Sequence, residues 1–259
     1  MDNLYRIEAC AKLIQNAKHL AVITGAGIST PSGIPDFRSP KKGLWKQYDP
    51  MKVASLTSFR SSPEIFYNWL RPLAQKIRVA APNPAHDAIA KLEHLGLAKS
   101  VITQNIDFLH QRAGSKNVIE VHGSLNSFSC PKCSSLFPWD EVQDEFVFND
   151  QLPRCRKCNS ILKPDIVLFE EQLPQAAWIK ATIEMEKADV VLIAGTSLEV
   201  TPANELPLYA LQLFAHLIIV NLSPTYLDTQ ADFVFHEDAA LILPKLVLSI
   251  ETRMINHVR

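Results

Sequence analysis

Apolar residues recur along this chain with two periods, which together predict alternating helices and buried strands. Leu4, Ile7, Ala11 and Ile14 recur at helical spacing and predict an amphipathic first helix. Short apolar runs without polar alternation, such as Ala188 to Ala194, are typical of parallel strands covered on both faces. The predicted strands are 21–24, 99–103, 118–121, 188–194, 217–220 and 233–235, with a helix at 85–95 and a closing helix or turn at 240–248.

The residues that follow these apolar runs are small or polar. Gly25 and Gly27 follow the first predicted strand, Asn105 follows the second, His122 the third and Gly195 the fourth. The carboxyl ends of parallel strands meet at one edge of a sheet, where open α/β sheets bind their ligands. We therefore predict an α/β protein with a doubly wound parallel sheet and one site along one sheet edge.

The loop after the first strand has the features of a ligand-binding loop. Its glycines let the backbone approach a ligand closely, although Gly33 does not complete the usual dinucleotide spacing, so the loop is longer than in an ordinary dehydrogenase. The run Asp36-Phe37-Arg38 then places an acid, an aromatic ring and a base in a loop, where functional residues concentrate. A local ion pair between Asp36 and Arg38 is an alternative.

Two segments interrupt the alternation of strands and helices. Residues 41–81 carry aromatic side chains among polar positions, which predicts short helices that form a lid or small module around those rings. Farther on, Cys130, Cys133, Cys155 and Cys158 form two C-x2-C pairs. Four thiolates at this spacing can hold one tetrahedral zinc ion in a closed structural site, and two disulfides are the alternative.

Composition limits the classes of partner. The 259 residues include 26 basic and 27 acidic side chains, a balance that provides no bulk field to attract nucleic acid or an anionic membrane. The first twenty residues contain no apolar segment of secretory or membrane length, so we expect a cytoplasmic protein, and we expect a monomer. A reducing compartment favours the metal site over disulfides.

The run GAGISTPSGIPDFRS resembles the cofactor-loop signature of the sirtuins, the NAD-dependent protein deacylases. TQNID, VHGS, the two C-x2-C pairs, GTSLEV and VNLSP resemble further sirtuin motifs in the same order, over about residues 5–246. The resemblance implies removal of acyl groups from protein lysines, with consumption of NAD and release of nicotinamide, and a structural zinc ion. Mono-ADP-ribosyl transfer and a non-catalytic NAD-binding regulatory module are the alternatives.

The resemblance also implies a division of the chain. Residues 1–40, 82–125 and 165–259 are expected to form a Rossmann-like NAD-binding domain. Residues 41–81 are expected to form a helical insertion, and residues 126–164 a zinc-binding ribbon.

By the same match, His122 is implied to be the general base, because imidazole has a pKa near working pH. A single histidine is otherwise often a packing residue. Asn105 and Asp107 match catalytic positions that contact the ribose and the carboxamide of NAD. The implied cofactor-binding residues are Gly25, Ala26, Gly27, Ser29, Asp36, Phe37, Arg38, Gln104, Asn105, Ile106, Asp107, Gly195, Thr196, Ser197, Asn221, Leu222 and Ala239.

On the substrate side, the resemblance implies that a peptide adds as a β-strand between residues 164–169 and 198–200. Sirtuins that prefer acidic acyl groups share a Tyr-x-x-Arg pair, whereas here Leu70 occupies the third position after Tyr67. Arg71 comes one residue later, about 100° around a helix, so uncharged acyl groups are expected unless the register differs. The implied substrate-binding residues are Tyr67, Leu70, Val167, Phe169 and Val200.

Two positions depart from the sirtuin pattern. Phe108 and Glu170 stand where the family usually has glycine. Phe108 either narrows the nicotinamide end of the site or packs away from it. Glu170 adds a negative charge beside the expected peptide groove and removes the conformational freedom of glycine.

Overall fold

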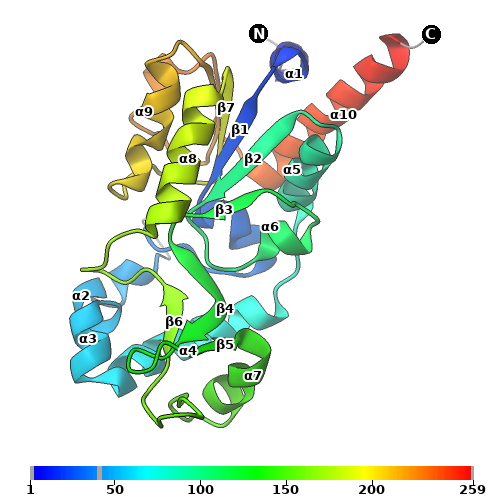
Figure 1. The fold of residues 1–259 in the computed structure, drawn as a ribbon. Coiled ribbons are helices and arrows are strands. Elements are labelled where there is room, and N and C mark those ends of the chain that lie inside the picture. The colour runs from blue at the N-terminus through cyan, green and yellow to red at the C-terminus, as the bar shows by residue number, and fades with distance from the viewer. Residues whose placement is uncertain (1–2, 40–42, 258–259) are drawn as a thin grey trace.

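A six-stranded parallel sheet forms the larger part of the molecule, as the computed structural model, which describes residues 3–39 and 43–257, shows (Figure 1). Its strand order is β3-β2-β1-β7-β8-β9, the order of a doubly wound dinucleotide-binding sheet, and the predicted fold class is confirmed. The strands are β1 (Leu20–Thr24), β2 (Ala98–Thr103), β3 (Val118–Glu120), β7 (Val190–Ala194), β8 (His216–Val220) and β9 (Phe233–Phe235).

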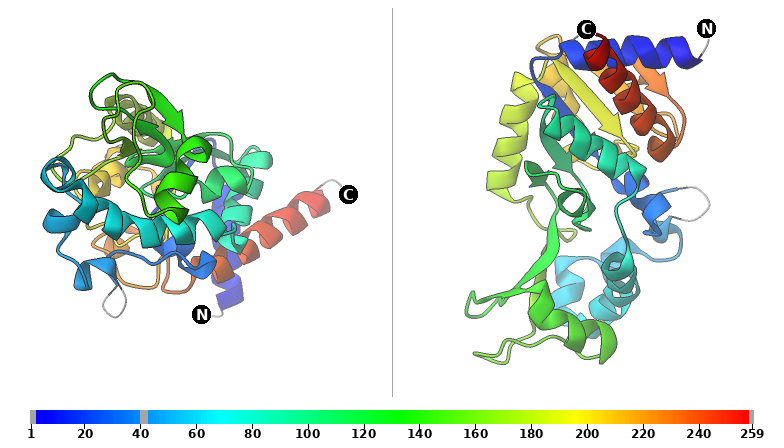
Figure 2. Two further views of the ribbon diagram at one scale, coloured as in Figure 1. Left: turned by 90° about the horizontal axis from the view of Figure 1, so that it is seen from below. Right: turned by 90° about the vertical axis from the view of Figure 1, so that its right-hand side faces the viewer.

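Helices cover both faces of this sheet (Figure 2). One face packs against α1 (Asn3–Asn16), α5 (Pro84–His94) and α10 (Ala239–His257), and the other against α8 (Gln175–Lys187) and α9 (Leu206–Leu211). The central strands β1 and β7 are apolar except for Thr24 at the end of β1. They are buried throughout because each of their faces meets a helical layer.

The first and last helices differ in detail from the predicted pattern. Ile7, Ala11 and Ile14 are buried as expected, whereas Leu4 is 61 % exposed. The closing element is a helix, and it continues well past residue 248 because Ile250 remains fully buried on the face that packs against the sheet. The closing element predicted at residues 240–248 was therefore too short.

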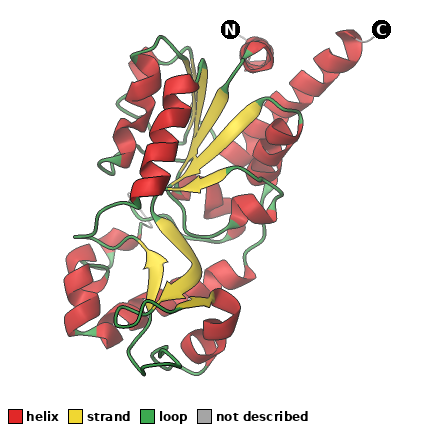
Figure 3. Ribbon diagram, in the orientation of Figure 1, coloured by secondary structure: helices red, strands yellow, loops and turns green. Residues whose placement is uncertain are grey.

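A smaller module lies beyond the carboxyl ends of the main strands (Figure 3). Its three-stranded antiparallel sheet has the order β5-β4-β6. We call its elements the small module: α2 (Pro50–Val53), α3 (Leu56–Ser61), α4 (Pro63–Val79), β4 (Gly123–Ser129), β5 (Leu136–Pro138), α7 (Trp139–Gln143) and β6 (Lys163–Ile166). The remaining short elements are the helix α6 (Leu109–Arg112), a π-helical turn at Asp144–Phe148, and 3-10 helices at Ala26–Ser32, Leu44–Lys46, Ala203–Glu205 and Asp228–Gln230.

The helices and the cysteine-bearing segment of the small module share one hydrophobic core. Phe66 and Tyr67 of α4 pack in the same buried cluster as Phe128 of β4 and Phe146. The predicted aromatic core is thus larger than either segment alone could supply. The domain division remains a prediction, and its boundary between residues 40 and 41 lies outside the described residues.

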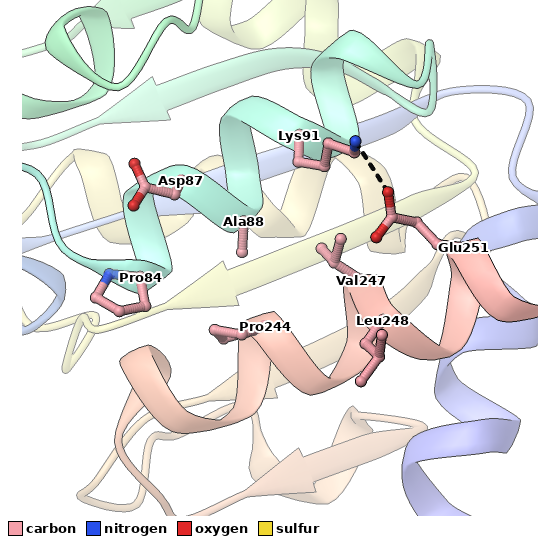
Figure 4. Close-up of a pocket in the computed structure, with 8 residues that line it drawn as sticks. All are labelled: Pro84, Asp87, Ala88, Lys91, Pro244, Val247, Leu248 and Glu251. Carbon is pink, nitrogen blue, oxygen red and sulfur yellow. Dashed lines mark ion pairs between the residues drawn. The ribbon is translucent and has the colours of Figure 1, made fainter.

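α5 and α10 leave a shallow groove of about 270 Å³ between them on the outer surface of the larger part (Figure 4). Ala88, Val247 and Leu248 supply apolar lining, and an ion pair of 2.9 Å between Lys91 and Glu251 spans the groove. The groove lies between two covering helices, apart from the loops at the carboxyl ends of the strands.

Tyr67 links α4 to the cysteine-bearing segment, and its removal tests this link. The Tyr67 ring is fully buried, and its hydroxyl donates a hydrogen bond to the carbonyl of Leu162, which is itself 1 % exposed. Burial also raises the pKa of Tyr67 well above its ordinary value, so the hydroxyl stays protonated. Tyr67→Phe should lower the free energy of unfolding by about 1–3 kcal/mol, because the carbonyl loses its donor in a dry site.

Denaturant unfolding of Tyr67→Phe measures this loss. Tyr5→Phe is the matched control, since the Tyr5 side chain is 63 % exposed, and it should leave the free energy of unfolding unchanged. Equal stability of Tyr67→Phe and the unaltered protein would contradict the structural role of this hydroxyl.

Candidate active site

Two loops touch backbone to backbone at the carboxyl edge of the main sheet. The N–H of Gly27, in the loop after β1, donates to the carbonyl of Gly195, in the loop after β7, at 2.8 Å. A Cβ on Gly27 would lie 2.8 Å from that carbonyl oxygen, and a Cβ on Gly195 would lie 2.2 Å from the nitrogen of Ile28. Gly195 also has a φ of 63°. Only glycine fits both positions, and we call residues 25–27 and 195 the glycine cradle.

The loop between the glycine cradle and Gly33 explains the unusual glycine spacing. Residues 26–32 form a short 3-10 helix, and Gly33, with a φ of 88°, ends it in the left-handed region. Because this extra turn carries Ser29 inward to 1 % exposure, the loop has to be longer than the usual dinucleotide loop. A cradle without a side chain at Gly27 or Gly195 fits the phosphates of NAD, because it lets them approach the backbone closely.

Ser29, Asn105 and Asp107 meet below this loop in one buried polar network. The Ser29 hydroxyl donates to Asp107 Oδ2 at 2.7 Å and accepts from Asn105 Nδ2 at 3.1 Å. Asn105 Nδ2 also donates to the carbonyl of Gly25 at 3.1 Å. Burial raises the pKa of Asp107, whereas the hydrogen bonds from Ser29 and from the N–H of Leu109 act in the opposite direction.

Sequence reasoning missed two histidines that extend this network. His86 lies 3.4 Å from Ser29 Oγ, and His110 Nε2 lies 2.9 Å from Thr24 Oγ1. The two rings are in edge contact, with centroids 4.9 Å apart. Burial lowers the pKa of His86 to about 4 and that of His110 to about 3, so both rings are neutral at neutral pH. The sequence did carry one signal for His86, a histidine within the apolar pattern of a predicted helix.

His122 follows β3 and lies where three segments meet. Its Nδ1 is 3.1 Å from the carbonyl of Gln104, and its own carbonyl accepts from the N–H of Val167 at 2.8 Å. A carbonyl can only accept, so the proton resides on Nδ1 and Nε2 keeps its lone pair. Burial lowers the pKa of His122, the bond to Gln104 raises it, and the charge of Arg38 lowers it further.

The segment Asp36-Phe37-Arg38 lies over this edge without the local ion pair considered from the sequence. Asp36 Oδ1 instead accepts from the backbone N–H groups of Arg38 and Ser39, at 3.0 and 2.6 Å. The Arg38 guanidinium faces Glu199 across the site, with Nε 3.7 Å from a carboxylate oxygen.

The residues expected to hold the adenosine half lie at the ends of β7, β8 and β9. Thr196 Oγ1 accepts from Gln104 Nε2 at 3.2 Å, which joins the loops after β7 and β2. Asn221 follows β8 and donates from Nδ2 to the carbonyl of Ser223 at 2.7 Å. Leu222 is 65 % exposed, and Ala239 begins α10. Ala26 and Ser197 belong to the loops after β1 and β7, and Ile106 packs against the small-module core.

The expected substrate residues fall into two groups. Val167, Phe169 and Val200 lie on loops beside the site, and Phe169 is 37 % exposed. Tyr67 and Leu70 are instead fully buried in the small-module core. The structure therefore does not bring the second group to the same surface as the first.

Arg71 points toward the segment after α7. Its Nε donates to the carbonyl of Phe146 at 2.8 Å, and its guanidinium pairs with Asp150 at 2.5 Å. The predicted turn of this side chain away from the acyl side thus agrees with the contacts that it makes.

The two residues at expected glycine positions keep a glycine-like backbone. Phe108 has a φ of 53° and Glu170 a φ of 74°. The Glu170 carboxylate accepts from the N–H of Thr57, in the first turn of α3, at 2.8 Å, which lowers its pKa and joins this loop to the small module. The Phe108 ring packs against the small-module core.

The cysteines form a compact cluster at the far end of the small module. Within the described residues all five cysteines are free, which excludes the disulfide alternative there. The sulfur atoms of Cys130, Cys133, Cys155 and Cys158 all lie within 4.8 Å of one another, with 3.3 Å between Cys130 and Cys158. Tetrahedral zinc with bonds of about 2.3 Å requires sulfur separations of about 3.8 Å, so the cluster fits this ion.

Each C-x2-C pair forms the same backbone knuckle. The N–H of Ser134 donates to the carbonyl of Cys130 at 2.9 Å, and the N–H of Asn159 donates to the carbonyl of Cys155 at 2.8 Å. Ser134 and Asn159 both have positive φ, at 56° and 60°. The two knuckles present four thiolates and leave no open position for catalysis.

Comparisons with known proteins agree with this architecture. The model of the Sir2 family matches residues 25–202. The chain is 45 % identical to NAD-dependent protein deacylase 2 of Archaeoglobus fulgidus, over 95 % of this chain and 96 % of that protein. It is 43 % identical to NAD-dependent protein deacetylase 1 of Pyrobaculum aerophilum, over 93 % of each.

Solved structures show the same similarity. A complex of a Sir2 homologue with NAD is 40 % identical and has a TM-score of 0.87, over 95 % of this chain and 94 % of that chain. A Sir2 structure with a deacetylated peptide and 3'-O-acetyl ADP-ribose is 40 % identical and has a TM-score of 0.88, over 93 % of this chain and 97 % of that chain.

Loss of one cysteine ligand tests the metal site. The unaltered protein should contain one zinc ion per chain, and Cys130→Ser should lose it and melt at a lower temperature, because a structural zinc ion contributes directly to folding. Elemental analysis and thermal melting measure both effects. Cys10→Ala is the control, since Cys10 lies in the separate core of the main sheet. Full zinc content in Cys130→Ser would contradict the assignment.

Proposed function

This chain belongs to the Sir2 family, the sirtuins, and we infer that it removes acyl groups from lysine side chains of proteins in a reaction that consumes NAD. It is an NAD-dependent protein deacylase. The observation that carries the chemistry is the lone pair of His122 Nε2, left free by the bond from Nδ1 to Gln104, at the same sheet edge as the glycine cradle. The positions of individual site residues in this reaction are our proposals.

We propose that the glycine cradle binds the phosphates of NAD and that Thr196, Ser197, Asn221, Leu222 and Ala239 hold its adenosine half. NAD, when bound, supplies the ribose carbon that accepts the acyl oxygen as nicotinamide leaves. The support is that these residues end neighbouring strands of one sheet. The close approach of Gly27 to Gly195 leaves no room for a side chain at either position.

Asn105 and Asp107 are proposed to bind the ribose and the carboxamide. Both are nearly buried, and Ser29 holds the two side chains in a fixed relation through one hydroxyl. This preorganisation lowers the cost of ordering the site around its ligand. Phe37 is proposed to exclude water from the reacting carbon. Arg38 is proposed to bind a negatively charged group of the ligand, and Glu199 balances the charge of its guanidinium where the two side chains meet.

His122 is proposed to take the proton from a ribose hydroxyl. Its Nε2 must be unprotonated to accept that proton, and burial helps because it lowers the pKa of the ring. The neutral ring is then the main form at neutral pH. The bond to Gln104 keeps the other nitrogen protonated and fixes the direction of the lone pair.

The acylated peptide is proposed to bind as an added strand between Val167 and the segment 198–200. Among the described residues, the carbonyl of Val167 and both backbone groups of Glu199 make no hydrogen bond. These groups are available to pair with an extended chain, which reads backbone shape more than sequence.

The remaining proposals concern the protein as a whole. We propose the domain division given above, a monomeric enzyme and a cytoplasmic location. The small formal charge of −1 supports a partner held by local geometry, with no direct binding of nucleic acid. No helix among the described residues has the length and apolar character that crossing a membrane requires.

Removal of the proposed base should slow turnover without loss of the fold. We expect His122→Ala to lower kcat by about 10²- to 10⁴-fold, the usual contribution of general base catalysis, and to keep NAD affinity within a few-fold. His94→Ala, at an exposed position on α5, is the control. Because the pKa of His122 lies below its ordinary 6.5, the acid limb of the kcat/KM profile should fall below pH 6.5. Full activity of His122→Ala would refute this role.

The acyl preference follows from the contacts of Arg71. Its guanidinium is engaged by Phe146 and Asp150, so no cation from this position meets the distal carboxylate of a succinyl group. Loss of a charge-assisted contact of about 1.5–3 kcal/mol should place kcat/KM for succinyl-lysine about tenfold or more below that for acetyl-lysine. One peptide carrying acetyl, succinyl or a long apolar acyl group provides the comparison. A succinyl value above the other two would show that this preference is wrong.

A further inference from the structure

A second groove lies on the outside of the junction between the main sheet and the small module. Its volume is about 480 Å³, within the range of about 300–1,000 Å³ that is common for small-molecule sites. We call it the α6–α7 groove after two of the helices that line it, which lie beside β4 (Figure 1). Its lining residues are Ile77, Arg78, Phe108, Gln111, Arg112, Asn126, Trp139, Asp140 and Gln143.

Aromatic and apolar side chains from three elements form the walls of this groove. Phe108 stands at the start of α6, Trp139 begins α7, and Ile77 comes from the last turns of α4. Ile77 and Trp139 are only 2 % and 7 % exposed, because most of each side chain packs in the small-module core. Phe108 is only partly buried and keeps part of its ring on the groove. Flat rings in such walls favour a planar ligand, which can stack or meet them edge to face.

The backbone of Phe108 is strained for a residue with a side chain. With φ 53° and ψ 16°, the residue occupies the left-handed region, which glycine adopts freely and which is unfavourable for a residue with a Cβ. Glycine would adopt this backbone without strain. Strained residues of this kind concentrate at ligand sites.

The charges around the groove favour an anion. Arg78 and Arg112 line it, against the single carboxylate of Asp140. That carboxylate already accepts from Gln143 Nε2 at 3.2 Å, and Gln143 Oε1 accepts from Arg78 Nε at 3.1 Å.

The guanidinium of Arg78 is held in place and has donors to spare. Its central carbon lies 4.3 Å from the centre of the Phe148 ring, a cation–π contact. Its two terminal nitrogens make no hydrogen bond or ion pair with any other described residue. Such a fork can bind one carboxylate through two N–H donors.

We propose that the α6–α7 groove is a binding site for a small planar aromatic carboxylate, with the ring between Phe108 and Trp139 and the carboxylate on Arg78. The site is separate from the proposed NAD and peptide residues. It adjoins them at one point, because Phe108 follows Asp107 in the chain and the next N–H, that of Leu109, donates to Asp107 Oδ1 at 3.0 Å. A bound ligand would therefore span the main sheet and the small module beside a proposed catalytic carboxylate.

Calorimetric titration of the zinc-loaded full chain with 2-naphthoate, without NAD or peptide, tests this proposal. We expect one ligand per chain with a Kd of about 1 mM or tighter, the affinity that ordinary contacts give a ligand of this size. Phe108→Gly removes one wall but relieves the backbone, and Arg78→Gln removes the charge. Each should weaken binding about tenfold, as should replacement of the probe by neutral 2-naphthamide.

Arg154→Gln is the matched control, because Arg154 is an exposed arginine of the cysteine-bearing segment that donates to the carbonyl of Asn159, outside the groove. Its affinity for 2-naphthoate should be unchanged. Thermal melting establishes that each variant is folded, and either groove variant decides the question if the other does not fold. Absence of binding to the unaltered protein would overturn the proposal. So would a groove variant that binds 2-naphthoate as tightly as the unaltered protein, or equal affinity for the neutral amide. The readout needs no turnover, so it does not depend on the deacylase assignment.

Discussion

The contact between Gly27 and Gly195 is the constraint on which the site depends. It brings the loops after β1 and β7 together at 2.8 Å, with no side chain between them. This closeness excludes a side chain at either glycine, and the residues that follow turn inward, so that Ser29 becomes buried. The parallel sheet makes the contact possible, because β1 and β7 are adjacent and their carboxyl ends meet at one edge.

Below that contact lies a buried hydrogen-bond network in which most of the side chains are neutral. His86 and His110 are buried and neutral, and their rings are in edge contact. Ser29 links His86 to Asn105 and Asp107. A buried network of this kind is stiff, because each member left without its partner would cost free energy. His122 differs from the two buried histidines. It has one nitrogen bound to a carbonyl and the other free, which is the arrangement that a general base requires.

The small module obtains its stability from two sources. Its helices and its cysteine-bearing segment share one hydrophobic core, which Tyr67 joins to Leu162 by a buried hydrogen bond. The four sulfur atoms lie at the end of this module and hold two backbone knuckles together when zinc is bound. The metal therefore stabilises the small module and takes no part in the reaction.

The sequence by itself determined the features that depend on neighbouring residues. Apolar runs located all six strands of the main sheet within one or two residues, and the glycine and cysteine spacings predicted the cradle and the metal site. Tertiary structure alone decided which distant side chains meet. It buried Tyr67 in a core, gave Glu170 a partner 113 residues away and turned Phe108 toward the outer groove. Local patterns record periodicity and turn chemistry, whereas these contacts arise only when segments far apart in the chain pack together.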